Sequence, residues 1–167
     1  FLSEVTQGGT HPAAEGFIAR NVIPTTNLDP NQQYDLAYDI RRNKADTLWK
    51  IIQPRLPVDA SGNWYWKCDS SSDELDGHFF GCATYFDHVC ESDQQKEEVR
   101  SVVRPIINHI LKHGYHLVDH DGKPTRWAHF SPDDMNRNEA WCDERGLNSY
   151  SMLTYLSIAH HITGNPR

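Results

Sequence analysis

Apolar residues recur at helical spacing along three stretches in the second half of the chain. They repeat every three or four positions near residues 73–90, 93–113 and 149–163. This period is typical of helices that bury one face against the rest of the protein. The sequence therefore predicts three well-formed helices over these ranges.

Local signals support the starts of two of these helices. Ser71 is followed three positions later by Glu74, and Ser92 is followed by Gln95 in the same way. Both match the capping-box pattern, in which two side chains satisfy free backbone N–H groups. Pro105 lies inside the second helical stretch and removes one backbone hydrogen bond, so we expect that helix to bend or break just before it.

The first half of the chain has a weaker pattern. Residues 1–33 are rich in Gly, Pro, Asn and Thr and predict loops and turns, whereas residues 32–52 show the near-helical spacing of short helical turns. Residues 53–69 carry two prolines and a Ser-Gly-Asn sequence, which predicts a loop with short extended pieces at Trp64–Lys67. Residues 115–130 alternate around an Asp-Gly turn and predict a small β-hairpin.

This order of elements favours an all-α fold with one small β-hairpin insertion. The length of 167 residues suits a single domain over 1–167. The chain begins without Met or a signal-peptide pattern and ends just past a helix terminus, so we expect it to be cut from a longer protein. No apolar run approaches the roughly 20 residues of a membrane span, so we expect no membrane partner.

Charge and cysteine spacing narrow the range of partners and cofactors. The net charge of −7 argues against a nucleic-acid partner, because phosphate binding needs a basic face. The four cysteines contain no C-x-x-C pair, so we expect neither a metal ion nor another cofactor. Several histidines are interpreted as helix C-terminal residues favoured by the helix dipole, not as metal ligands. They are His109, His113, His116, His160 and His161.

Four carboxylates lie close together in "KCDSSSDELDGHFFG", residues 67–81. Glu74 belongs to the capping box, whereas Asp73 and Asp76 share one helix face at i, i+3 spacing. Carboxylates on a face that leads into aromatic residues are typical of a sugar site. Asp73 and Asp76 are therefore candidate catalytic residues, and Asp69 and His78 are candidate substrate-binding residues. The alternative is that these acids only stabilise the start of a solvated helix.

A second cluster lies in the predicted hairpin, in "LVDHDGKPTRWAHF". Strand alternation would place Trp127 and His129 on one face and Arg126 on the other. Asp119, Arg126, Trp127 and His129 are candidate substrate-binding residues. The alternatives are that Asp119 only initiates the turn and that Trp127 and His129 belong to the core.

A third cluster, "WCDERGLNSYS", lies just before the last predicted helix. We expect that helix to be capped by Asn148 or Ser149. Glu144 is a candidate catalytic carboxylate and Arg145 a candidate substrate-binding residue. The alternative is that the two form an ion pair that only positions the loop.

Three segments carry a family resemblance: "WYWKCDSSSDELDGHFFGCATYFDHV", "HGYHLVDHDGKPTRWAHFSPDDMN" and "ERGLNSYSMLTYLSIAHHITGN". Together they resemble a group of uncharacterised bacterial proteins of the six-hairpin glycosidase-like superfamily, over roughly residues 11–165. The resemblance implies an (α/α)₆ toroid in which carboxylates at one end hydrolyse or eliminate glycosidic bonds. A full toroid needs twelve helices and this chain offers four or five. We therefore expect a partial toroid of helical hairpins, a fragment of a longer one.

The resemblance leaves three functions open. The first is a carbohydrate-active enzyme, or a fragment of one, that hydrolyses glycosidic bonds with carboxylate acid and base residues. The second is a polysaccharide lyase acting on uronate-containing glycans, with a Tyr or His base and an arginine that neutralises the uronate. The third is a non-catalytic carbohydrate-binding or sensor module. Fold alone does not choose among them.

All three functions imply an oligosaccharide or polysaccharide partner, and a polysaccharide-degrading enzyme would be periplasmic or secreted. An incomplete toroid would also leave apolar helix faces uncovered, which favours self-association.

Overall fold

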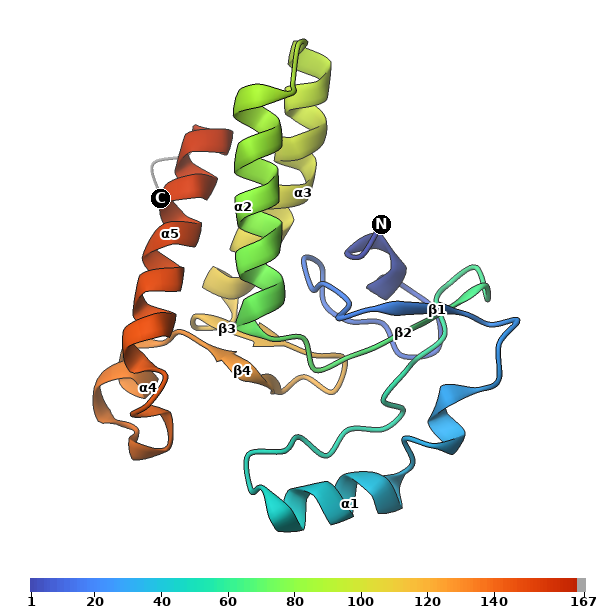
Figure 1. Ribbon diagram of the computed structural model, residues 1–167. Helices are drawn as coiled ribbons and strands as arrows, with labels where there is room; N and C mark the ends of the chain where they lie inside the picture. The colour runs from blue at the N-terminus through green and yellow to red at the C-terminus, as the bar shows by residue number, and fades with distance from the viewer. Residues whose placement is uncertain (165–167) are drawn as a thin grey trace.

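The computed structural model describes residues 1–164. Three long helices lie side by side: α2 (Ser72–His88), α3 (Asp93–Lys112) and α5 (Arg145–Thr163) (Figure 1). An antiparallel hairpin of β3 (His116–Val118) and β4 (Pro124–His129) crosses beneath one end of these helices. The helices and the hairpin together form the helical half of the molecule.

The remaining elements are short. In the N-terminal half, residues 1–70, strand β1 (Val22–Pro24) pairs with β2 (Trp64–Trp66), and α1 (Leu36–Ala45) lies between them in the chain. Helix α4 (Pro132–Arg137) follows the β3–β4 hairpin. Single 3₁₀ turns occupy Glu4–Thr6, Pro30–Gln32 and Glu139–Trp141.

The expectation of an all-α fold is wrong. Residues 1–164 form two small antiparallel sheets and five α-helices, so the fold is mixed α/β. A partial toroid of helical hairpins is likewise not found among residues 1–164. The predicted extended piece at Trp64–Lys67 matches β2, but its pairing with β1 was not predicted, because strands of three residues are too short for a period of two to show.

The three long helices and the small hairpin were predicted correctly. The structure places helices over 72–88, 93–112 and 145–163 and pairs strands within 116–129. Both predicted capping boxes are present, at Ser71 with Glu74 and at Ser92 with Gln95. Short-range side-chain hydrogen bonds therefore specify the starts of α2 and α3.

Helix α3 runs unbroken through Pro105, so of the two expected outcomes, a bend or a break, the break is excluded. The Pro105 carbonyl instead forms part of a tight contact with the N-terminal loop. A Cβ atom at Gly16 would lie 2.0 Å from the Pro105 carbonyl oxygen, and Gly16 has a φ of +86°. Only glycine fits this close approach, which packs the loop onto the helix.

Helix α5 begins four or five residues earlier than predicted. Its N-cap is Glu144, and Asn148 lies buried within the first turns. The Asn148 side-chain amide donates hydrogen bonds to the Trp127 and His129 carbonyl oxygens, at 3.3 and 3.1 Å. Asn148 therefore ties α5 to strand β4 instead of capping the helix.

The hydrophobic core is formed mainly where α2, α3 and α5 meet. The Phe79 and Tyr155 rings stack with their centroids 4.6 Å apart. Other fully buried members come from these helices, from the N-terminal loop and from strand β2. They include Leu75, Ile106, Ile110, Ile162, Phe17, Ile18 and Trp66. None of the helices in residues 1–164 combines the length and the apolar content needed to cross a bilayer.

Candidate functional site

Three of the predicted substrate-binding residues, Asp69, Asp119 and Arg126, meet near the turn of the β3–β4 hairpin. Asp69 has a left-handed backbone, with φ of 58°, and its Oδ1 accepts a hydrogen bond from the Arg126 backbone N–H at 2.9 Å. The Asp69 N–H in turn donates to Asp119 Oδ2 at 2.7 Å. Both carboxylates are buried and are bonded to the protein itself. Their geometry therefore indicates a structural role.

The sequence interpretation missed the ion network behind Asp69. Asp39 is fully buried on α1, and its Oδ1 accepts from Arg55 Nε at 2.9 Å and from Trp49 Nε1 at 3.0 Å. Asp39 Oδ2 accepts from the Ile52 backbone N–H at 3.1 Å. Arg55 also faces Asp69 Oδ2 at 3.4 Å. This chain of ion pairs joins α1 to the segment that leads into α2.

Helix α1 turns its polar side inward to make this network. Leu36 and Ile40, two of the apolar residues that give residues 32–52 their near-helical spacing, are 51% and 40% exposed. Asp39 between them is the buried residue. Hydrophobic periodicity could not reveal this arrangement, because the partners of Asp39 lie in the irregular segment 49–55.

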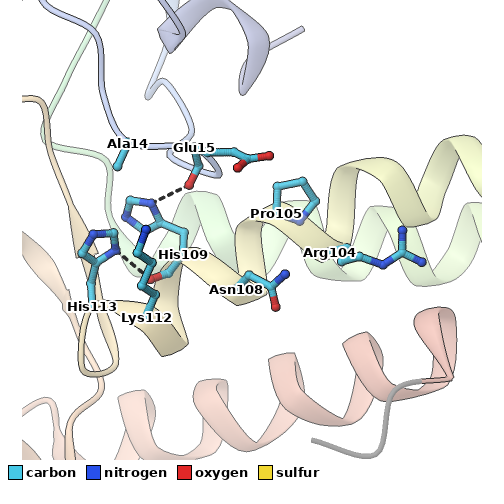
Figure 2. A pocket seen from close by; sticks show the side chains of 8 residues that line it. All are labelled: Ala14, Glu15, Arg104, Pro105, Asn108, His109, Lys112 and His113. Carbon is cyan, nitrogen blue, oxygen red and sulfur yellow. Dashed lines mark hydrogen bonds between the residues drawn. The ribbon is translucent and has the colours of Figure 1, made fainter.

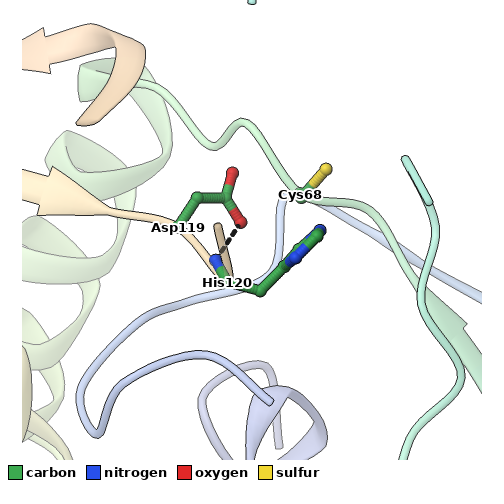
Figure 3. A group of neighbouring side chains, drawn as sticks. All are labelled: Cys68, Asp119 and His120. Carbon is green, nitrogen blue, oxygen red and sulfur yellow. Dashed lines mark hydrogen bonds between the residues drawn. The ribbon is translucent and has the colours of Figure 1, made fainter. Parts of the chain in front are cut away.

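Cys68, Asp119 and His120 form a second group of neighbouring polar side chains (Figure 3). Asp119 accepts from the His120 backbone N–H at 2.9 Å and faces Lys50 Nζ at 3.6 Å. Burial raises the pKa of the Cys68 thiol well above its usual value, and that thiol donates to the Arg55 carbonyl oxygen at 2.9 Å. The protonated thiol is a poor nucleophile, and the nearby lysine cation disfavours a metal ion in this group.

The acids at the start of α2 divide into three environments. Glu74 accepts from the Ser71 N–H at 2.6 Å and faces Arg20 Nε at 3.4 Å, which fits the predicted cap. Asp73 is exposed. Asp76 is half-buried, and its Oδ1 accepts a 2.5 Å hydrogen bond from the Tyr155 hydroxyl group.

Tyr155 was not among the predicted site residues. Its hydroxyl group lies 3.1 Å from the Ser72 carbonyl oxygen as well as 2.5 Å from Asp76. Burial, the hydrogen bond to Asp76 and the negative charges of Asp76 and Asp73 all raise the pKa of Tyr155. The phenol therefore stays protonated and acts as a permanent hydrogen-bond donor that orients the Asp76 carboxylate.

An aromatic hollow of about 310 Å³ lies between residues 47–50, strand β4 and the 3₁₀ turn Glu139–Trp141. Its lining residues are Thr47, Leu48, Trp49, Lys50, Pro124, Arg126, His129 and Trp141. Two of the predicted substrate-binding residues, Arg126 and His129, thus line one hollow. Indole rings beside cationic donors can bind a sugar ring and its polar or anionic substituents.

Aromatic contacts position the side chains on this side of strand β4. The His129 ring stacks on Trp141 with centroids 4.1 Å apart and an interplanar angle of 22°. The Arg126 guanidinium lies 4.2 Å from the centre of the Trp127 ring and also pairs with Asp46. Trp127 therefore supports Arg126 beside the hollow.

His116, His129 and Asp134 converge at the edge of this hollow. Asp134 Oδ2 lies 2.7 Å from His116 Nε2 and 3.2 Å from His129 Nδ1. The polar contacts of Asp134 with His116, Asn138, His129 and Ser131 outweigh partial burial and lower the pKa of Asp134 to about 2. Burial lowers the pKa of His129. The sequence interpretation assigned His129 to substrate binding, but His116 and Asp134 were not among the candidates.

The remaining predicted residues lie in two other parts of the structure. Glu144 and Arg145 lie at the start of α5, with Arg145 exposed. His78, on α2, instead lines a cavity of about 340 Å³ beside the N-terminal turn, together with Phe1 and Ile106. Burial lowers the pKa of His78.

A smaller cavity of about 180 Å³ lies where the N-terminal loop crosses α3 (Figure 2). The His109 Nδ1 atom lies 2.9 Å from the Glu15 carbonyl oxygen, and the Val118 backbone N–H donates to His109 Nε2 at 2.9 Å. These contacts require a neutral ring with its proton on Nδ1. Burial lowers the pKa of His109 to about 4, which fits that assignment. His109 is thus a structural residue of this cavity.

Comparisons with known proteins add no identification. A scan against protein-family models, a search of curated proteins and a search of solved structures each gave no significant match. Evidence for a function therefore comes from the geometry of the side chains and from the resemblance of the three sequence segments.

Proposed function

We propose that this chain is part of a carbohydrate-active enzyme that hydrolyses glycosidic bonds, with Asp73 and Asp76 as its carboxylates. The observation that carries this proposal is the fixed orientation of Asp76 by the Tyr155 hydroxyl group, one helical turn from the exposed Asp73. Most glycosidases use two carboxylates, one to transfer a proton and one to attack or to activate water. The resemblance of the three sequence segments supports the same reaction.

The two carboxylates suit different roles. Asp73 is exposed in the first turn of α2, where a substrate can reach it, and is the better candidate for the general acid or base. Asp76 is half-buried and held by Tyr155, which suits a group that must keep one position throughout the reaction. Residues at i, i+3 have Cβ atoms about 5–6 Å apart, so both can face one glycosidic bond.

The lyase alternative receives less support from this site. A lyase base must lose its own proton before it can remove one from the sugar. The pKa of Tyr155 is raised by burial and by Asp76, so the phenol does not become a base at neutral pH. Another base would have to replace it.

A non-catalytic sugar-binding role remains the second candidate, because of the aromatic hollow. Trp49, Trp141 and Arg126 line it, and the hollow does not include Asp73 or Asp76. A sugar bound there would lie against rings and cations without contacting the proposed carboxylates. Binding without turnover would therefore favour this second role.

The test is an assay of the chain with oligosaccharides that do and do not contain uronates. We expect new reducing ends without the ultraviolet absorbance of an unsaturated uronate. Asp73→Asn should lower the turnover by about 10²-fold or more, because it removes a proton-transfer group. Tyr155→Phe, which frees Asp76 without removing it, should lower the turnover less.

Asp93→Asn is the matched control, because Asp93 is also an exposed acid in the first turn of a helix, α3. It should leave the turnover unchanged. Full activity in Asp73→Asn and Asp76→Asn would overturn the assignment of the carboxylates. An unsaturated product would establish the lyase, and binding of the sugars with no product would establish the second candidate.

A further inference from the structure

We propose that His116, His129 and Asp134 form a binding site for one divalent transition-metal ion, of the kind that takes nitrogen and oxygen ligands, such as zinc. This goes beyond the proposed function and does not depend on it. The sequence predicted no metal site, because the cysteines form no C-x-x-C pair and His116 was interpreted as a helix C-terminal residue.

Three separate elements bring the ligand atoms together. His116 on β3 and His129 on β4 are cross-strand partners in the antiparallel hairpin. Asp134 comes from the first turn of α4, just after β4. One nitrogen from each ring and one Asp134 oxygen lie within 4.8 Å of one another.

The hydrogen bonds to the outer ring nitrogens assign the protons. His116 Nδ1 faces the His113 carbonyl oxygen at 3.2 Å, and His129 Nε2 faces the Thr125 carbonyl oxygen at 2.8 Å. A carbonyl oxygen only accepts, so both outer nitrogens carry the proton. In a neutral ring the inner nitrogen then presents a lone pair, and both lone pairs point at the Asp134 carboxylate.

The nitrogen lone pairs of His116 and His129 repel the Asp134 carboxylate unless a positive charge lies between the rings and the carboxylate. Two additional protons would supply that charge, but they would place two imidazolium rings with centroids only 4.9 Å apart. A single divalent cation satisfies both lone pairs and the carboxylate without this repulsion. Tetrahedral zinc holds its nitrogen and oxygen ligands about 3.3 Å apart, so the 2.7 and 3.2 Å contacts need only small side-chain shifts.

Each of the three side chains is also held by a neighbour in the way that metal ligands usually are. Metal-binding histidines typically donate the other ring N–H to a backbone carbonyl or carboxylate, as His116 and His129 do here. The Asn138 side chain donates to Asp134 Oδ1 at 3.0 Å, and the Ser131 hydroxyl group donates to Oδ2, the proposed ligand atom, at 3.0 Å. Trp141 stacks on His129 and fixes the plane of its ring.

The site has three protein ligands and is open to solvent. The side chains are 16–19% exposed, so an ion and its water molecules can enter. Three protein ligands with open positions are typical of reactive sites, whereas structural zinc sites have four. His129 also lines the aromatic hollow, so the open positions lie near the place where a ligand could bind.

The test is titration of the metal-free protein with Co²⁺, followed by its visible absorption, and with Zn²⁺, followed by calorimetry. We expect one ion per chain, with affinity lowered by at least about 100-fold in His116→Gln and in His129→Gln, because each removes a ligand. His161→Gln is the matched control. It breaks a single exposed pair, His161 to Asp87 at 2.7 Å, and should leave the affinity unchanged.

A measurement on the unaltered protein keeps the test decisive if a variant does not fold. Zn²⁺ should shift the side-chain nitrogen resonances of His116 and His129 and leave those of His161 in place. The absence of saturable binding at one ion per chain would overturn the proposal. Equal affinity in folded His129→Gln, or shifts confined to other histidines, would overturn it as well.

Discussion

The two halves of this molecule are stabilised in different ways. In the helical half, the contact between α2, α3 and α5 is made by apolar side chains such as Leu75, Phe79 and Ile106. The N-terminal half also supplies Phe17, Ile18 and Trp66 to the hydrophobic core, but around α1 it is held by the buried Asp39 and Arg55, which bind each other and the irregular segment 49–55. Helix α1 contributes only one buried residue, and that residue is Asp39.

This difference determines how strictly each half requires particular side chains. Apolar burial is non-directional and scales with area, so many side chains of similar volume can provide it. A buried ion pair depends on direction, because every donor and acceptor must be satisfied in place. The Arg55 guanidinium meets Asp39, Asp69 and the Lys50 carbonyl oxygen and lies 4.7 Å from the centre of the Trp49 ring. We therefore expect the N-terminal half to tolerate fewer substitutions.

The largest expected effect is at Asp39. Asp39→Ala leaves the buried Arg55 cation without its main partner and leaves the Trp49 indole N–H unsatisfied. It should lower the free energy of unfolding by about 3–5 kcal/mol, measured by urea denaturation. Asp87→Ala, which removes an exposed pair with His161, should cost less than about 1 kcal/mol. Similar costs for the two variants would contradict the importance of the buried network.

The second effect concerns His109, where the N-terminal loop meets α3. The unfolded chain binds a proton at this ring near pH 6.5, but the folded chain does so only near pH 4. The neutral His109 ring therefore makes its full contribution to the free energy of unfolding above pH 6.5. Up to about 3 kcal/mol of that free energy is lost as the pH falls towards 4. Urea denaturation at several pH values measures this loss.

His109→Gln is the comparison protein for that experiment. Glutamine can donate and accept hydrogen bonds but does not titrate, so its free energy of unfolding should depend less on pH between 6.5 and 4. The other histidines contribute equally to both proteins. Identical pH dependence in the two proteins would show that His109 is not the group responsible.

A pair of conservative substitutions compares the two halves directly. Arg55→Lys keeps the charge but loses the planar set of donors that reaches Asp39 and Asp69, and should cost about 2 kcal/mol. Leu75→Met keeps the volume of an apolar side chain in the helical core and should cost less than about 1.5 kcal/mol. Thermal unfolding followed by circular dichroism can rank the two. A larger cost for Leu75→Met would reverse the comparison.

The smallest expected effect is at the boundary between the halves, where Glu74 of α2 faces Arg20 of the N-terminal loop. Glu74→Gln retains an oxygen that accepts from the Ser71 N–H but loses the partly exposed ion pair. The free energy of unfolding should fall by less than about 1 kcal/mol. A loss of several kcal/mol in chemical denaturation would mean that this ion pair holds the two halves together.

Parts of the candidate site could be predicted from the sequence. Helical spacing placed Asp73 and Asp76 on α2, and the capping pattern identified the role of Glu74. Tyr155 could not be connected with Asp76, because the two are 79 positions apart and nothing local indicates their hydrogen bond. A signal for the histidine pair was available, since the Asp121-Gly122 turn of the hairpin places residue 116 opposite the region of residue 129.

The sequence by itself determined the elements whose stability is local. Apolar period, capping boxes and a two-residue turn signal act over a few positions, so they identified α2, α3, the body of α5 and the hairpin. The tertiary structure decided which polar groups are buried, because burying Asp39 or Asp69 is favourable only when distant donors meet it. It also decided the pairing of β1 with β2, since strands of three residues are stable only when long-range contacts bring them together. The convergence of His116, His129 and Asp134 depends on tertiary structure for the same reason, because it requires the hairpin and α4 to be packed together.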